Sequence, residues 1–261
     1  MDKTFSIIIP FKNNDKSRER NLHFILNYYK KYLPSCEIIV VEQNTNTNFL
    51  LTSDKVQKYL KIKTEDNFFA KALLFNSGYN ISRTDYIIMA DIDCVIDKNI
   101  LENITDYYQY FDFHFVLPYN NKVHYLSEIE TNRFINEDDC NISQNQDKDV
   151  NGLKAASGGI GIISSSNFYK VGGFDERFKG WGAEDDAFYN KCSIMGVSPH
   201  RLSYDLLHLH HNVFYTEDTN YGNNLKTYNE HFTKNREDFI KDIDYKYLLN
   251  QQNNIDHVRI T

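Results

Sequence analysis

Two carboxylates separated by one residue directly follow an apolar segment, and together they are candidate ligands for a metal ion. Asp91 and Asp93 come after residues 86–89, whose apolar run is typical of a buried strand. In extended backbone, alternate side chains point to the same side, so both carboxylates face one way. Such hard oxygen ligands suit Mg²⁺ or Mn²⁺, which commonly bridge to phosphate oxygens. Two acids after a strand are also common in solvated turns, so other motifs must support the metal-site prediction.

A second cluster combines glycines, the only tryptophan of the sequence and three acids. Glycines on both sides of Trp181 predict a flexible loop that carries a large flat side chain. The acids Glu184, Asp185 and Asp186 then open a predicted helix, whose N-terminal dipole favours negative charge. Capping a helix needs fewer carboxylates than this, so one of the three is a candidate general base.

Three histidines within four residues form a third cluster. His208 and His210 share a face if this segment is a strand, whereas His208 and His211 converge if it is a helical turn or an irregular loop. Imidazole and carboxylate together are an ordinary ligand set for Mn²⁺. The alternative is a histidine that is simply hydrogen bonded in the core.

The elements that position these residues can be predicted from the first half of the chain, where short apolar runs alternate with helical patterns. This alternation predicts βαβ units on a mostly parallel sheet, and ligands of such sheets bind beyond the carboxyl ends of the strands. The polar loops that follow three of the strands are therefore expected to meet at one edge. The predicted strands are residues 5–9, 37–41, 60–63 and 86–89, the predicted helices are residues 18–33, a segment near Asp54 and residues 69–80, and the converging loops are residues 10–14, 42–44 and 90–94.

Two later segments are predicted differently. Residues 120–150 are polar and are expected to form a long connection of the kind that often serves function. Residues 223–252 carry apolar and aromatic side chains at helical spacing, which predicts a helical tail that packs on its own domain. The tail mixes acids and bases and has no polybasic patch, so peripheral association with a membrane is the weaker hypothesis.

Composition and charge restrict the class of protein. The 261 residues, 41% of them hydrophobic, are enough for one large α/β domain with a full core. A net charge of −7 argues against nucleic acid as a partner. Four scattered cysteines suggest neither a zinc site nor a disulfide framework, and no signal or membrane-spanning segment is recognisable. These features favour a reduced, cytoplasmic chain.

Several segments together resemble glycosyltransferases with the GT-A fold. The nearest resemblance is to the β-1,4-galactosyltransferase-like group, which shares its C-terminal motif with bacterial chondroitin-type capsule polymerases. The matching segments are SIIIPFKNN, FFAKALLFNSGYN, DYIIMADIDC, the glycine-rich block that ends in GWGAEDDAFYNKC, and HLHHN. The resemblance implies a Rossmann-like α/β domain over residues 1–215, with a nucleotide-sugar half (1–118) and an acceptor half (119–215), followed by a helical extension over residues 216–261.

The same resemblance implies a metal-dependent, inverting transfer of a hexose or N-acetylhexosamine. The donor would be a UDP-sugar, the cofactor Mn²⁺ or Mg²⁺, and the acceptor a glycan, a lipid-linked sugar or a protein-linked sugar, with a role in surface polysaccharide synthesis. Matched by motif position, the residues that would contact the donor are Pro10, Phe11, Lys12, Phe69, Lys71 and Asp91, and those that would hold the metal are Asp93, His208 and His211. Asp185 would be the catalytic base, and the acceptor would be bound by Glu184, Asp186 and Gly159. Trp181 would lie on a lid over both substrates.

Two positions depart from the pattern of the family. Asn14 stands where the animal enzymes carry a second arginine, so phosphate charge is expected to be met by Lys12, Lys71 and the metal. Ala156 stands where galactose-selective relatives carry a bulky aromatic residue. This predicts a roomier pocket that accepts an N-acetylhexosamine.

Three other functions compete with this prediction. A retaining polypeptide N-acetylgalactosaminyltransferase has a similar glycine, tryptophan and acid block, but its metal motif usually ends in histidine where this chain has Asp93. An inactive carbohydrate-binding homologue would release no UDP. A sugar nucleotidyltransferase needs a glycine-rich basic loop after the first strand, and PFKNN is not such a loop.

Overall fold

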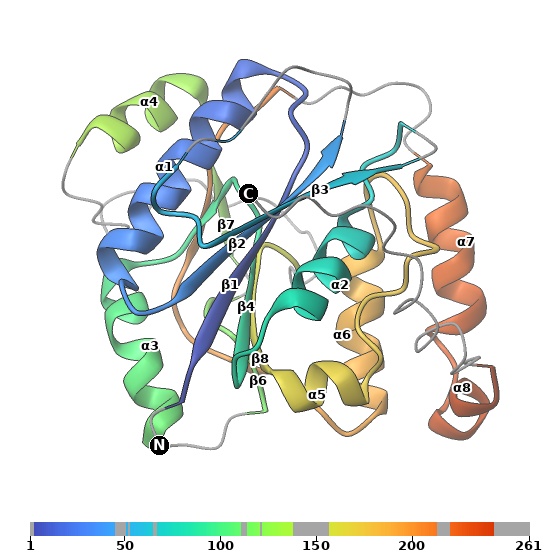
Figure 1. The fold of residues 1–261 in the computed structure, drawn as a ribbon. Helices are drawn as coiled ribbons and strands as arrows, with labels where there is room; N and C mark the ends of the chain where they lie inside the picture. The colour runs from blue at the N-terminus through green and yellow to red at the C-terminus, as the bar shows by residue number, and fades with distance from the viewer. Residues whose placement is uncertain are drawn as a thin grey trace.

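The computed structural model describes residues 3–44, 51, 53–64, 67–110, 114–120, 122–137, 157–212 and 220–242. Over these residues the chain has the layered α/β fold that the sequence predicts (Figure 1). Its centre is a seven-stranded sheet with the strand order β3-β2-β1-β4-β8-β6-β9. These strands are β1 (Phe5–Phe11), β2 (Glu37–Asn44), β3 (Lys58–Lys63), β4 (Tyr86–Ala90), β6 (Phe115–Leu117), β8 (Ile160–Ser164) and β9 (His200–Arg201).

The directions of the strands determine where the polar loops lie. β1 runs parallel to β2 and to β4, and β2 runs parallel to β3, whereas β8 is antiparallel to both β4 and β6. The carboxyl ends of β1, β2 and β4 therefore lie at one edge of the sheet, as predicted. Every residue of β1 and β4 is buried, which is expected for strands with helices on both faces.

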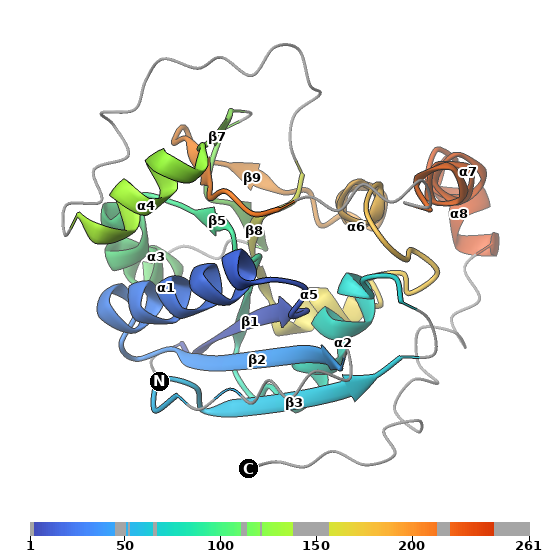
Figure 2. The ribbon, with the colours of Figure 1, turned by 90° about the horizontal axis from the view of Figure 1, so that it is seen from above.

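Helices cover both faces of the sheet. α1 and α3 lie on one face, and α2, α5 and α6 lie on the other (Figures 1 and 2). α2 comes very close to the sheet at Gly78, where a Cβ atom would stand 2.3 Å from Cγ2 of Ile8, so the packing requires glycine. The helices are α1 (Lys16–Tyr32), α2 (Lys71–Ile81), α3 (Lys98–Tyr110), α4 (Glu128–Asn136), α5 (Ser165–Lys170), α6 (Glu184–Ile194), α7 (Tyr221–His231) and α8 (Arg236–Asp242).

A second, three-stranded sheet brings the histidine segment to the end of β4. It consists of β5 (Cys94–Val95), β7 (Val123–Tyr125) and β10 (Leu206–His208) in the order β5-β10-β7. β10 is antiparallel to β5, and its register places His208 opposite Cys94. The backbone N–H of Leu209 also donates to the carbonyl oxygen of Asp93 at 2.7 Å. The two clusters are thus joined by backbone hydrogen bonds.

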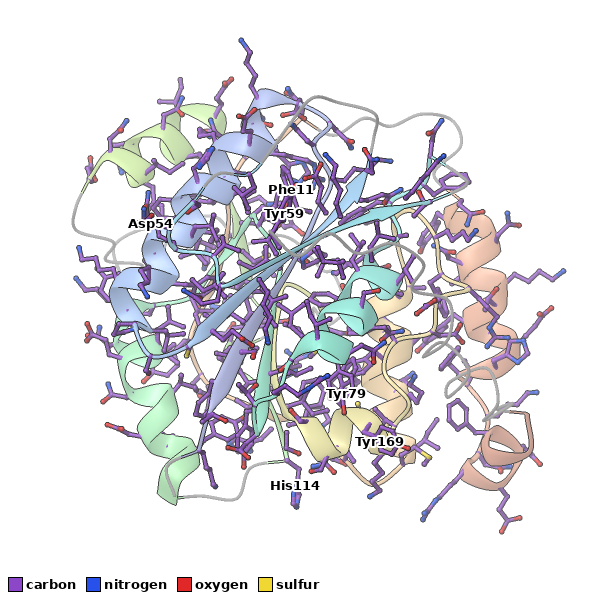
Figure 3. The ribbon with its side chains drawn as sticks, viewed as in Figure 1. Phe11, Asp54, Tyr59, Tyr79, His114 and Tyr169 are labelled. Carbon is purple, nitrogen blue, oxygen red and sulfur yellow. The ribbon has the colours of Figure 1, made fainter. Side chains whose placement is uncertain are left out.

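The helix predicted near Asp54 is wrong. The described residues around it form a turn, which the N–H of Val56 closes by donating to the carbonyl oxygen of Ser53 at 3.3 Å. Asp54 lies beside α1 (Figure 3), where it lines a cavity together with His23 of that helix. The turn leads directly into β3, whose pairing with β2 begins at Lys58.

The long irregular connection predicted for residues 120–150 is wrong for part of its length. β7 and α4 form within it, and α4 begins with a capping box in which Ser127 and Glu130 satisfy each other's backbone N–H groups. Phe134 anchors α4 in the core. Residues 138–150 lie outside the described part of the chain.

The predicted helical tail is present as two helices, α7 and α8, with a break after His231. Phe232 and Phe239 are buried against Phe178 and Ala187, so the tail packs on its own domain, against α6 and the segment before it. Residues 243–252 lie outside the described part of the chain. Among the described helices, none has both the length and the apolar content that crossing a membrane requires.

Candidate active site

Lys71, the first residue of α2, holds three carboxylates together at the carboxyl edge of the sheet. Its Nζ lies 2.8 Å from Oδ2 of Asp91, 2.8 Å from Oδ2 of Asp185 and 3.7 Å from Oε1 of Glu184. Burial lowers the pKa of Lys71, but the charges of Asp185, Asp91 and Glu184 outweigh this effect and raise it well above 10.5. The lysine is therefore a permanent cation that joins the residues after β4 to the start of α6.

Two of the acids around Lys71 have raised pKa values. Burial, together with repulsion from Asp185 and Asp93, raises the pKa of Asp91 to about 6 despite the nearby Lys71. Burial and repulsion from Asp185 raise the pKa of Glu184 to about 7. One cation does not balance three carboxylates, so this group favours the arrival of further positive charge.

Asp93, His208 and His211 form a cluster that fits a divalent metal ion. Nε2 of His211 lies 3.2 Å from Oδ2 of Asp93, Nε2 of His208 lies 3.8 Å from Oδ1, and the two imidazole centroids are 5.3 Å apart. One candidate ligand atom from each residue lies within 4.8 Å of the other two. One carboxylate and two imidazoles are a donor set that suits Mn²⁺. The histidines that converge are thus His208 and His211.

His210 has a structural position instead. Its backbone N–H donates to Oγ1 of Thr131 at 2.8 Å, and its carbonyl oxygen accepts from Arg20 and Asn21. Among the described residues it is not part of the candidate metal cluster. This backbone anchoring holds the segment between His208 and His211 against α1 and α4.

His211→Ala is expected to weaken Mn²⁺ binding by at least about tenfold, because losing a direct ligand should cost no less than losing a residue that orients one. The matched control is His210→Ala in the next position, which should leave Mn²⁺ affinity within about twofold. Isothermal titration calorimetry with Mn²⁺ measures both. Equal losses in the two variants would mean that the wrong histidine has been identified.

Mn²⁺ affinity is also expected to fall as the solution becomes more acidic. Burial lowers the pKa of His211, but its hydrogen bond to Asp93 and the charge of that carboxylate outweigh burial and raise the pKa above its usual 6.5. Because a metal ion binds the neutral imidazole, the Kd should rise by up to about tenfold per pH unit below this pKa. Calorimetry at several pH values tests this, and an affinity independent of pH below neutrality would contradict it.

A pair of glycines lies between the acids that follow β4 and the acids of α6. A Cβ atom on Gly158 would stand 2.0 Å from Oδ2 of Asp185, so the backbone approaches this carboxylate as closely as glycine allows. The carbonyl oxygen of Gly159 accepts from the N–H of Asp91 at 2.8 Å. Ser157 in turn donates to Oδ1 of Asp186 at 2.5 Å. Residues 157–159 therefore connect Asp91 to Asp185 and Asp186 of α6.

Trp181 is highly exposed beside these acids. Its side chain is 69% exposed, and the N–H of Gly182 donates to Oε2 of Glu184 at 2.9 Å. The other end of the loop is tied to the start of α2, because the N–H of Gly180 donates to the carbonyl oxygen of Phe69 at 3.0 Å. The loop thus runs between the acids of α6 and the segment that leads to Lys71.

The predicted donor residues at the end of β1 are only partly available. Lys12 is nearly buried, and its Nζ donates to the carbonyl oxygen of Asn67, while Phe69 is half-buried. Phe11, at the carboxyl end of β1 (Figure 3), has no exposed surface. Because helices cover both faces of the sheet, its ring packs in the core, and its place in a donor pocket stays a prediction from the resemblance.

Arg18 is a residue of the site that sequence reasoning missed. Burial raises the pKa of Asp93, but the charge of His208, the hydrogen bond to His211 and the charge of Arg18 outweigh burial and hold this pKa well below its usual range. The Nε atom of Arg18 is buried without a hydrogen-bond partner among the described residues. Asp15 caps α1 by accepting from the N–H groups of Ser17 and Arg18, which fixes the first turn of α1 at this edge. Arg18 thus supplies positive charge near Asp93, four residues after Asn14.

Comparison with known proteins shows that the chain is similar to β-1,4-galactosyltransferases. The chain is 26% identical to mouse β-1,4-galactosyltransferase 7 over 157 residues, which are 59% of this chain and 39% of that protein. It is 22% identical to mouse β-1,4-galactosyltransferase 2 over 201 residues, which are 75% of this chain and 41% of that protein. The chain thus spans about two fifths of the length of these curated relatives.

A solved structure and a family profile extend the comparison. The catalytic domain of Drosophila β-1,4-galactosyltransferase 7, in complex with xylobiose, superposes with a TM-score of 0.50 at 18% identity, covering 80% of this chain and 71% of that one. This likeness confirms the fold. The profile described as glycosyltransferase-like family 2 matches residues 6–254, nearly the whole chain. The chain therefore belongs to glycosyltransferase-like family 2.

Proposed function

We propose that this chain is a metal-dependent, inverting glycosyltransferase that moves a hexose or N-acetylhexosamine from a UDP-sugar to a hydroxyl of a glycan acceptor. The observation that carries the proposal is the position of Lys71, which lies at 2.8 Å from both Asp91 and Asp185, on the same edge as the Asp93, His208 and His211 cluster. A candidate phosphate-binding cation, a candidate metal site and a candidate base thus lie at one edge of the sheet, which supports the proposal. The similarity to β-1,4-galactosyltransferases supports the same reaction.

In the proposed donor site, Asp93, His208 and His211 hold the divalent metal. When bound, the metal supplies a Lewis acid that stabilises the charge of the departing diphosphate. Lys71 and Arg18 add positive charge at the same edge, where a fixed cation stabilises negative charge that develops as the glycosidic bond breaks. Asp91, which faces Lys71, is proposed to contact the ribose and the sugar. The remainder of the nucleotide is proposed to contact Pro10, Lys12 and Phe69.

In the proposed acceptor site, Asp185 accepts the proton of the attacking hydroxyl. The carboxylate is held by Lys71 and lies against Gly158, so its position is fixed before the substrate arrives. Attack on the anomeric carbon from the face opposite the leaving diphosphate inverts its configuration. Glu184, Asp186 and Gly159 are proposed to bind other acceptor groups, and the Trp181 loop to exclude water during transfer.

The acceptor and the setting of the reaction are further parts of the proposal. The acceptor is proposed to be a glycan, lipid-linked or protein-linked, in surface polysaccharide or glycoconjugate synthesis. Peripheral association of the chain with a membrane assembly is the weaker alternative, because the tail packs on its own domain. The three described cysteines, Cys36, Cys94 and Cys192, are buried and free, which is compatible with a reducing compartment such as the cytoplasm. Ala156 lies outside the described residues, so acceptance of N-acetylhexosamines stays a prediction from sequence.

A donor screen tests the proposed function. UDP release is measured with Mn²⁺ and UDP-Gal, UDP-GlcNAc, UDP-GalNAc, UDP-Glc or UDP-GlcA, with and without glycan acceptors, and again after chelation of the metal. We expect metal-dependent, acceptor-stimulated release with at least one N-acetylhexosamine donor. Activity with UDP-Gal alone would contradict the roomier pocket. Absence of release with every donor would indicate a carbohydrate-binding homologue.

A further inference from the structure

Asn224, a buried asparagine in the C-terminal helix α7, is hydrogen bonded to the loop that carries Trp181, which comprises residues 179–182. The residue is only 1% exposed. Its Nδ2 donates to the carbonyl oxygens of Lys179 and Gly182, each at 3.0 Å, and to that of Trp181 at 3.4 Å. Its Oδ1 accepts from the N–H of Lys179 at 3.3 Å. One side chain therefore satisfies backbone groups at the start, middle and end of the loop.

A ring from the first turn of α7 holds the same loop from another side. The centroid of Tyr221 lies 5.5 Å from that of Trp181, with the two rings inclined at 31°. Gly182 has a φ of +107°, and a Cβ atom there would stand 2.4 Å from Cδ2 of Tyr221, so the loop can approach α7 this closely only with glycine. Both the backbone of the loop and the indole of Trp181 are thus in contact with α7.

α7 has its own anchor, which does not depend on the loop. Phe232, just after α7, and Phe239 of α8 are buried with Phe178 and Ala187, and Nδ2 of Asn190 on α6 donates to the hydroxyl of Tyr228. Both views place α7 and α8 beyond α6, on the side away from the central sheet (Figures 1 and 2). The helix is therefore fixed to α6, and it carries Asn224 and Tyr221 to the loop.

The loop meets the proposed acceptor site at its other contacts. The N–H of Gly182 donates to Glu184, and Glu184 lies 3.7 Å from Nζ of Lys71. A displacement of the loop would therefore change both the cover over the acids and the surroundings of Glu184. Motion of this kind affects the step that needs both substrates more than it affects donor binding.

We propose that α7 belongs to the transferase site. Asn224 is a positioning residue that holds Trp181 next to the proposed acceptor site, which contains Glu184 and Asp185. The inference rests on the proposed function and adds to it a role for the C-terminal extension. Without the asparagine amide, the Trp181 loop is released, water enters the acceptor side, and donor hydrolysis gains relative to transfer. Donor binding, which depends on Lys71 and the metal ligands, is retained.

The loop can be followed directly, because Trp181 is the only tryptophan in the sequence. Acrylamide quenching and fluorescence anisotropy of Trp181 are compared in the wild-type chain, in Asn224→Ala and in the control Asn229→Ala, an exposed asparagine on the same helix. We expect stronger quenching and lower anisotropy in Asn224→Ala alone. Circular dichroism and thermal melting establish that each variant is folded. Unchanged fluorescence in folded Asn224→Ala would overturn the inference.

Kinetics with the active donor then separate positioning from a merely structural role. Asn224→Ala should lower kcat/KM for the acceptor by about 10- to 100-fold, with the donor KM within about twofold and a higher ratio of hydrolysis to transfer. Tyr221→Ala, which removes a half-exposed ring, should likewise increase the quenching of Trp181 and the ratio of hydrolysis to transfer. If Asn224→Ala does not fold, the result for Tyr221→Ala tests the inference. A normal ratio in folded variants contradicts the inference.

The two proposals fail differently. The fluorescence measurements need no substrate, so they report on the loop even if the wild-type chain releases no UDP. If the wild-type chain transfers sugar and both variants transfer as well as Asn229→Ala, the proposed function stands and the role of α7 is refuted. If quenching changes as expected but no donor is turned over by the wild-type chain, the proposed function fails and α7 loses its catalytic role with it.

Discussion

Asp185→Asn is expected to reduce sugar transfer by about 10²- to 10⁴-fold, because a carboxamide cannot accept the proton of the attacking hydroxyl. The substitution keeps the size of the side chain and an oxygen that can accept from Lys71, whose Nζ lies 2.8 Å from Oδ2 of Asp185. Donor affinity should therefore stay close to that of the wild-type chain. Steady-state kinetics give the transfer rate, and calorimetry with the donor and Mn²⁺ gives the binding.

Asp186→Asn is the matched control for this prediction. Asp186 is the next residue on α6, but its Oδ1 accepts from Ser157, and among the described residues the ion-pair partners of Lys71 are Asp91, Glu184 and Asp185 instead. We expect it to raise the acceptor KM while kcat changes by less than about tenfold. Full turnover by Asp185→Asn, or an equal loss of kcat in both variants, would show that Asp185 is not the base.

Asp93→Ala is expected to remove metal-dependent donor binding, with Mn²⁺ affinity reduced by on the order of 10²-fold or more. Its buried carboxylate lies between two imidazoles, at 3.2 Å from Nε2 of His211 and 3.8 Å from Nε2 of His208, so its loss leaves only neutral ligands. Because Mn²⁺ is proposed to hold the donor diphosphate, donor affinity should fall in parallel. Calorimetric titrations with Mn²⁺, and then with the donor, measure the two losses.

Asp91→Asn is the informative comparison for the metal site. Asp91 is two residues away on the same loop, but its Oδ2 pairs with Lys71 at 2.8 Å rather than with the histidines. Its replacement should leave Mn²⁺ affinity within about threefold while weakening donor binding. If the two aspartates proved interchangeable in Mn²⁺ titrations, the metal would lie between them and not with the histidines.

The convergence of the site could be predicted from sequence because it follows from strand direction. The apolar runs that become β1, β2 and β4 are recognisable, and parallel strands bring their carboxyl ends to one edge. The choice of His208 and His211 over His210 could not be made in this way. It depends on the pairing of β10 with β5, two short strands whose partners are more than a hundred residues apart in sequence.

Pairings across long sequence separations were likewise out of reach. Lys71 could be matched to a phosphate site, but its ion pair with Asp185, 114 residues later, is created only by the fold. Arg18 was missed because its position depends on the start of α1, which the Asp15 cap sets two residues before the predicted helix start.

In the C-terminal tail, the apolar pattern predicts the helix but not the burial of Asn224. Its helical spacing was predicted correctly for α7, and Phe232 and Phe239 are buried as expected. Leu225 in the same stripe is 39% exposed, whereas its neighbour Asn224 is buried at 1%. An asparagine in a helix gives no sign in sequence that it is buried, because its hydrogen-bond partners at Lys179 and Gly182 lie more than forty residues earlier in the chain.

The configuration of the newly formed glycosidic bond tests the central claim most directly. The product of a Mn²⁺-dependent reaction between the active UDP-sugar and a glycan acceptor is analysed by proton NMR, in which the coupling at the anomeric proton distinguishes α from β. Direct attack with Asp185 as the base predicts an inverted, β-linked product from an α-linked UDP-hexose. An α-linked product would contradict this mechanism and would indicate a retaining transferase instead.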